Sequence, residues 1–137
     1  MEGEDALWAQ TTDGGLLHQL FGYYPTLHDA RVRELTIAQG KVTLILDYHD
    51  RAESGDELKA RVRLEWGGVR ELDLPLGLED LYRFELSRSG DDIVAHLEDA
   101  AYGAGRVVSE TFEVVLMLLD PGPTDEPARL RYRSEPF

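Results

Sequence analysis

The chain has no cysteine among its 137 residues. This absence excludes a disulfide framework, thiolate metal ligands and a cysteine nucleophile, and it is compatible with a reducing compartment. Long apolar runs are missing too, because the longest candidate, 114–119, is far shorter than the ~20 residues of a membrane-spanning helix. The first five residues include three acids and no base, whereas a secretory or organellar signal would be basic. We therefore expect a cytoplasmic protein that does not enter a membrane.

Basic residues are scarce. The 14 lysines and arginines face 27 aspartates and glutamates, which gives a formal net charge of −13. Such a charge repels phosphate backbones, so we expect no nucleic-acid partner. The excess of acid favours solubility, and it would also attract a basic partner such as a nuclease.

Catalytic motifs are absent as well. The sequence contains no phosphate-binding glycine loop, no Gly-x-Ser-x-Gly elbow and no His-Glu-x-x-His helix. The glycines at 103–105 are not followed by a helical pattern, so the segment 102–105 is expected to form a turn. We predict that the protein is not an enzyme and has neither a catalytic residue nor a cofactor.

The length predicts a single domain over 1–137, preceded by a short acidic N-terminal extension over 1–12. The segment 13–21 is the best helix candidate, since Leu16, Leu17, Leu20 and Phe21 form one stripe and Gly22 is a natural stop.

Strand patterns separated by turn residues follow this helix. Tight hairpins are expected at Gln39-Gly40 and Gly67-Gly68, and a slightly longer one at 90–92. The run 114–119 reads as a central strand covered on both faces. The strands expected are 32–38, 41–48, 60–66, 69–76, 84–89, 93–98, 114–119 and 129–133. This pattern predicts an α+β domain with a predominantly antiparallel sheet or sandwich of about eight strands and one short N-terminal helix.

Basic side chains alternate with apolar ones along two of these strands, at 59–63 and 129–133. A period of two is typical of a half-buried strand. The pattern predicts a solvated sheet face with cross-strand ion pairs.

Two His-Asp pairs are the candidate chemical groups, namely His28-Asp29 and His49-Asp50. Imidazole and carboxylate groups can together bind a metal ion or share a proton. Adjacent residues of a strand point to opposite faces, so one site would need both pairs to meet. We interpret the pairs as structural, with Asp29 accepting backbone N–H bonds in a turn. The four residues remain alternative metal candidates.

The segment 21–30 is the most distinctive of the chain, and it reads Phe21-Gly22-Tyr23-Tyr24-Pro25-Thr26-Leu27-His28-Asp29-Ala30. It resembles the Phe-Gly-aromatic-Pro-Ser-Phe-His-Asp-Ala segment of the immunity protein 50 family of bacterial polymorphic-toxin systems. The segment 63–74 is similar to that family's strand, glycine-valine turn and strand, and 101–103 is similar to its late Tyr-Gly element.

The resemblance implies a small cytoplasmic protein that binds and neutralises a cognate toxin domain without catalysis. It marks Phe21, Gly22, Tyr23, Tyr24, Pro25, His28 and Asp29 as motif positions with a structural or binding role. Two alternatives remain. One is a β domain that binds a small ligand or metal through His28, Asp29, His49 and Asp50, and the other is an oligomerising scaffold.

Overall fold

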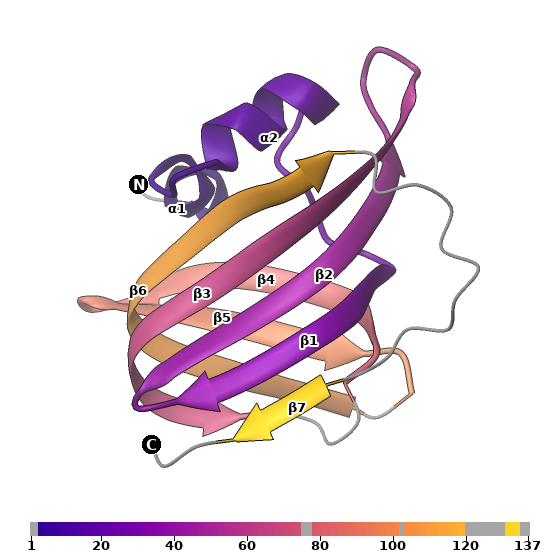
Figure 1. The fold of residues 1–137 in the computed structure, drawn as a ribbon. Coiled ribbons are helices and arrows are strands. Elements are labelled where there is room, and N and C mark those ends of the chain that lie inside the picture. The colour runs from indigo at the N-terminus through magenta and orange to yellow at the C-terminus, as the bar shows by residue number, and fades with distance from the viewer. Residues whose placement is uncertain (1–2, 75–77, 102, 120–130, 135–137) are drawn as a thin grey trace.

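A computed structural model describes residues 3–74, 78–101, 103–119 and 131–134. Two short helices precede a single sheet (Figure 1). The elements in chain order are α1 (Glu4–Ala9), α2 (Gly14–Phe21), β1 (Ala30–Ala38), β2 (Lys41–Arg51), β3 (Glu57–Asp73), β4 (Asp80–Ser89), β5 (Asp92–Asp99), β6 (Gly103–Leu119) and β7 (Arg131–Ser134).

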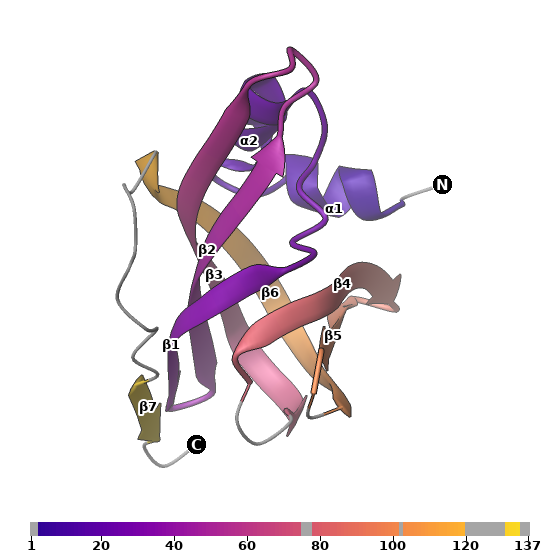
Figure 2. The same ribbon diagram turned by 90° about the vertical axis from the view of Figure 1, so that its right-hand side faces the viewer.

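The sheet curls until its two ends meet. Its strand order is β2-β3-β6-β5-β4-β1-β7, and β1 also pairs with β2. The contact that closes the curl is short, since β1 meets β4 only at Ala30 opposite Leu81 and Arg31 opposite Asp80. β4 and β5 therefore lie across from β1 and β2, with the core between them (Figures 1 and 2). All pairings are antiparallel except that of β7 with β1.

The prediction of a predominantly antiparallel sheet is confirmed, while its count of about eight strands and one helix matches only roughly. The hairpin at Gln39-Gly40 is present, as is the one between β4 and β5. The last strand begins at Arg131, and residues 129 and 130 of its predicted range lie outside the described residues.

The prediction of a hairpin at Gly67-Gly68 is wrong, because β3 runs through both glycines as one strand of 17 residues. A Cβ on Gly67 would lie 2.6 Å from the Thr111 hydroxyl, and Gly68 has a φ of +59° beside Glu110. The two glycines thus allow β3 to bend while it stays paired with β6. A register shift between Val69 and Glu71 marks the bend.

β6 is longer than predicted. The prediction of a turn at 102–105 is wrong for its described part, since Gly103–Gly105 begin β6 and pair with β5.

The prediction that 114–119 is covered on both faces is wrong at the end of this run, because Met117, Leu118 and Leu119 are 41–45% exposed. The C-terminal half of β6 pairs with β3 along one edge, and its other edge bonds to Asp13. The Asp13 N–H donates to the Val114 carbonyl, and the Asp13 carboxylate accepts from Leu116 N.

The predicted helix over 13–21 matches α2, which buries Leu17 and Phe21 and ends at Gly22 with a φ of +85°. Within the N-terminal extension expected over 1–12, residues 4–9 form the additional helix α1, which buries Leu7 and Trp8. The Trp8 ring packs edge-on against Phe84 and Phe112, at centroid distances of 6.0 and 6.1 Å. Neither helix of the described residues is long and apolar enough to cross a membrane.

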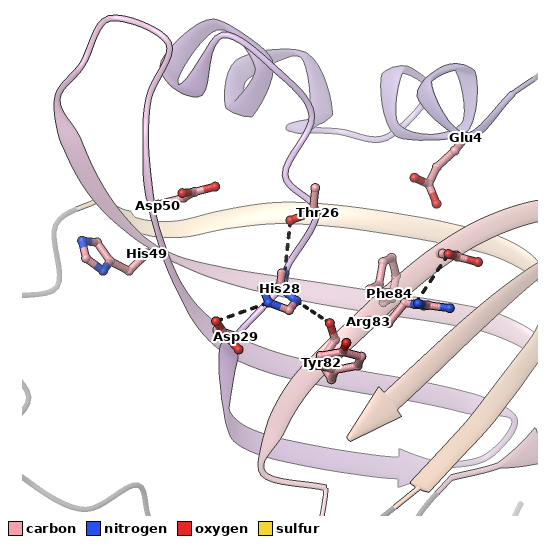
Figure 3. Close-up of a pocket in the computed structure, with 10 residues that line it drawn as sticks. Glu4, Thr26, His28, Asp29, His49, Asp50, Tyr82, Arg83 and Phe84 are labelled. Carbon is pink, nitrogen blue, oxygen red and sulfur yellow. Dashed lines mark hydrogen bonds and ion pairs between the residues drawn. The ribbon is translucent and has the colours of Figure 1, made fainter. Parts of the chain in front are cut away.

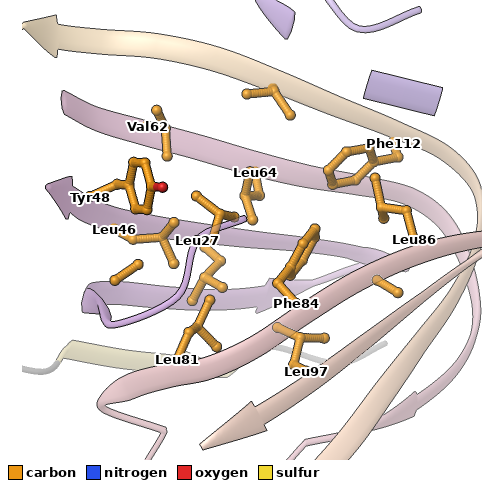
Figure 4. Packing of buried hydrophobic residues seen from close by; sticks show 14 of the residues in the cluster. Leu27, Leu46, Tyr48, Val62, Leu64, Leu81, Phe84, Leu86, Leu97 and Phe112 are labelled. Atoms are coloured by element: carbon orange, nitrogen blue, oxygen red, sulfur yellow. The ribbon is translucent and has the colours of Figure 1, made fainter. Parts of the chain in front are cut away.

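The inner face of the curled sheet is apolar, and Leu27 enters it from the loop before β1 (Figure 4). The outer face of β1, β2 and β3 carries ion pairs, as the alternation at 59–63 predicted. The side chains of 129–133, the other alternating run, lie outside the described part of the structure. Arg33 and Arg61 both bond to Asp47, each with a shortest N–O distance of 2.8 Å. Ion pairs of this kind on a partly exposed face contribute little each, typically under about 1 kcal/mol.

Candidate functional site

The loop between α2 and β1 folds into a strained turn over residues 26–30. Leu27 and Asp29 both have positive φ values, +58° and +63°. A leucine in this region costs about 1–2 kcal/mol, and burial of its side chain in the core offsets that cost. Backbone bonds tie the turn down, since Asp29 N donates to the Leu81 carbonyl over 2.6 Å and Ala30 N to the Leu27 carbonyl over 3.1 Å. The exposed residue between the two strained positions is His28.

The His28 ring is oriented by β4. Its Nδ1 lies 2.6 Å from the Tyr82 carbonyl oxygen, and its Nε2 lies 3.5 Å from an Asp29 carboxylate oxygen. A carbonyl only accepts, so Nδ1 carries a proton and donates it. The Tyr82 ring lies beside the imidazole, at a centroid distance of 5.3 Å. Asp29 therefore contacts His28 through its carboxylate, in place of the backbone N–H bonds expected from the sequence.

A second cluster lies at the end of β2, around Asp50. The Tyr23 and Tyr48 hydroxyls each lie 2.8 Å from the same Asp50 oxygen, and Arg51 N donates to the other. Burial acts to raise the pKa of Asp50, but these hydrogen bonds outweigh it and lower the pKa below its usual value. Burial, followed by the bond to Asp50, raises the pKa of Tyr23 to about 12 and shifts that of Tyr48 in the same direction. Both phenols are neutral donors at physiological pH.

These two clusters face one groove of about 560 Å³ (Figure 3). We call it the β1–β4 groove. Its lining residues come from α1, the turn, the end of β2 and β4, and are Glu4, Thr26, His28, Asp29, His49, Asp50, Tyr82, Arg83, Phe84 and Glu85. Both His-Asp pairs thus share one groove. Residues 28 and 29 can both line the groove because they lie in a turn, where the positive φ at Asp29 replaces the alternation that a strand would impose.

The groove lining is acidic. Its described lining contains four carboxylates, from Glu4, Asp29, Asp50 and Glu85, and one guanidinium, from Arg83. Glu4 accepts a bond from Leu86 N over 2.5 Å, and burial raises its pKa. Arg83 lies 3.9 Å from Glu85 and 4.0 Å from Glu98, so its charge is shared with a carboxylate outside the groove.

Among the described lining residues, those of α1 and β4 were missed from the sequence. No sequence signal could have found them, because the closure of β1 on β4 is a long-range pairing.

The four candidate metal ligands share the groove but do not form a coordination set. His49 lies 3.5 Å from Glu57, outside the groove lining, and His28 is bonded to Tyr82. Among the described residues, no three His, Asp or Glu side chains are arranged to hold a metal ion.

The remaining motif positions precede the turn in the chain and have packing roles. Phe21 is fully buried, with its ring centroid 5.4 Å from that of Tyr48. A Cβ on Gly22 would meet the Glu53 side chain at 2.5 Å, so the chain passes too close there for a larger residue. The Tyr24 ring lies beside His18, and Pro25 is buried. The segment 21–30 is thus one structural unit that ends in the groove.

Compared with models of protein families, with curated proteins and with solved structures, the chain has no match.

Proposed function

We propose that this chain is a cytoplasmic, non-catalytic immunity protein that binds and neutralises a cognate protein toxin. One observation supports the proposal above others: the segment that resembles the immunity protein 50 family, 21–30, contributes Thr26, His28 and Asp29 to the β1–β4 groove. A distinctive sequence segment that ends in an exposed, preorganised surface is typical of a binding element.

The groove has the properties of a protein-binding surface. The turn is held by the burial of Leu27 and by its bonds to β4, so little conformational entropy would be lost when a partner binds. Tyr82, which is 46% exposed, and Arg83 lie side by side on β4, and tyrosine and arginine are enriched among residues that dominate interface energies. Inhibition by covering a toxin surface requires affinity and no chemical step.

Coexpression in a bacterium tests the proposal. A toxin domain encoded beside the gene of this chain should stop growth when expressed alone, and coexpression of the chain should restore growth. An inactive toxin variant should copurify with the chain, which separates binding from indirect rescue. Growth arrest that persists at full expression of the folded chain would count against the proposal.

A second candidate is a domain that binds a free small ligand, and its supporting observation is that both His-Asp pairs line the same groove. Native mass spectrometry of the chain purified from its host would detect such a ligand as added mass. A His28→Ala variant should then lose that mass, while a variant of His18, which lies on α2 beside Tyr24, should retain it.

A further inference from the structure

We infer that the β1–β4 groove receives an arginine side chain of the partner protein. The inference rests on the proposed function, since it takes the partner to be a protein, and it names the chemical group that the groove recognises.

Charge gives the first reason. Among the described residues, four carboxylates and one guanidinium line the groove, together with two imidazoles and the Tyr82 phenol. Such a lining repels phosphate and carboxylate ligands and attracts a cation. Arg83 does not cancel this charge, because it is also drawn to Glu98 outside the groove.

The shape of the lining groups gives the second reason. Tyr82 presents a half-exposed ring beside His28, whereas Phe84 borders the groove from the core and is 5% exposed. A guanidinium is planar, stacks on aromatic faces and sheds water more easily than an ammonium does. The mixture of aromatic and carboxylate groups therefore suits arginine better than lysine.

Free acceptor oxygens give the third reason. The Asp29 side chain is 79% exposed, and within the described part of the chain its carboxylate contacts His28 at 3.5 Å. Glu4 uses one oxygen for Leu86 N, and Glu85 contacts Arg83 only at 3.9 Å. These carboxylates come from the turn, from α1 and from β4, and any of them can accept from a guanidinium, which has five donors.

A titration with N-acetyl-L-arginine amide tests the site directly, since this probe mimics an arginine within a chain. In ¹H–¹⁵N spectra we expect saturable shifts at the amides of His28, Asp29, Tyr82 and Arg83. N-acetyl-L-citrulline amide has nearly the same shape without the charge and should produce at least tenfold weaker binding. Equal binding of the two probes, or shifts confined to other regions, would overturn the inference.

Agmatine, a free small cation, forms the third arm of this titration. Similar binding of agmatine and the arginine probe is expected if only the guanidinium is recognised. Binding of agmatine a hundredfold tighter than the probe would identify a free small cation as the occupant, and would overturn the assignment to a partner's side chain.

Variants connect the groove to the toxin. The double variant Asp29→Asn with Glu85→Gln removes two groove carboxylates and should weaken toxin binding about tenfold, mostly at low salt. The control, Asp56→Asn with Asp91→Asn, makes the same charge change at two exposed turn positions outside the groove and should bind as the wild type does.

The outcomes separate the two proposals. If the toxin binds the groove variant as tightly as the wild type, the groove inference fails and the proposed function stands. If the wild type binds no toxin, the proposed function fails, while saturable binding of the arginine probe in the groove still supports the guanidinium site. Spectra of each variant that match the wild type away from the substitutions show that its fold is intact.

Discussion

Asp99 is the buried carboxylate that holds the start of β4 against the end of β5. One of its oxygens accepts bonds from Glu79 N and Asp80 N, over 2.8 and 3.1 Å, and the other accepts from Ala101 N over 2.8 Å. The residue is only 5% exposed. Because Asp80 pairs with Arg31 where β1 closes on β4, this carboxylate also supports the closure of the sheet.

Replacing Asp99 with asparagine should destabilise the fold. The amide keeps one acceptor oxygen and turns the other into a donor, so at least one backbone N–H loses its partner. We expect the free energy of unfolding in urea to fall by about 1–3 kcal/mol. Asp91→Asn, at an exposed position of the β4–β5 turn, is the control and should change it by less than about 0.5 kcal/mol. Equal stability of the two variants would contradict this role for Asp99.

Tyr23 predicts a pH dependence. Its pKa is raised from 10.0 to about 12, first by burial and then by its bond to Asp50. The unfolded chain therefore releases this proton at lower pH than the folded chain does. Tyr23 contributes stability that is complete below about pH 10 and is lost as the pH rises toward 12. Tyr23→Phe should be about 1 kcal/mol less stable at pH 8, yet should lose less stability than the wild type between pH 9 and 11.5.

Urea unfolding at a series of pH values measures this difference. Wild-type and Tyr23→Phe stability curves that stay parallel through the alkaline range would show that the phenol is not shifted by the fold.

At the scale of elements, the turn over 26–30 is the link between the core and the groove. Leu27→Ala should lower the free energy of unfolding by about 2–5 kcal/mol, because a fully buried leucine is removed and the strained backbone loses its anchor. The matched control is Leu16→Ala on α2, where the side chain is 42% exposed, and it should cost under about 1 kcal/mol.

Hydrogen exchange at the Asp29 amide gives a second measurement of the same variant. This amide donates to Leu81 on β4, so its protection should fall in Leu27→Ala more than that of an amide in the β2–β3 pairing. Unchanged protection would mean that the turn is held by its backbone bonds alone.

Elements with a local pattern could be predicted from the sequence. α2 has an apolar stripe and a glycine stop, and the hairpin at Gln39-Gly40 joins two alternating runs. Gly67-Gly68 has the same local appearance, but its conformation is decided by the close approach of Thr111 and Glu110 on β6. α1 was missed because six residues carry too little periodicity, and its Trp8 is buried by rings from β4 and β6.

At the scale of the whole molecule, the closure of the sheet creates the candidate site. His28, Asp29, His49 and Asp50 were singled out from the sequence, and the structure brings them to one groove. Tyr82, Arg83 and Glu4 joined them only because β4 and α1 close against the turn, which no local pattern encodes. A site formed by distant segments requires the fold to be known.

The net charge of −13 creates a field around the whole molecule that acts on any charged partner. An acidic protein attracts a basic partner over a distance set by ionic strength, about 8–10 Å at physiological salt. The rate of toxin association should therefore fall about tenfold or more between 20 and 500 mM sodium chloride, with a much smaller change in the dissociation rate. Surface plasmon resonance measures both rates, and an association rate independent of salt would exclude electrostatic steering.

The most direct test of toxin binding is isothermal titration of the purified chain with the inactivated toxin domain encoded beside its gene. The proposed function predicts a saturable complex with a fixed stoichiometry and nanomolar or tighter affinity. Absence of a complex at micromolar concentrations of both folded proteins would contradict it.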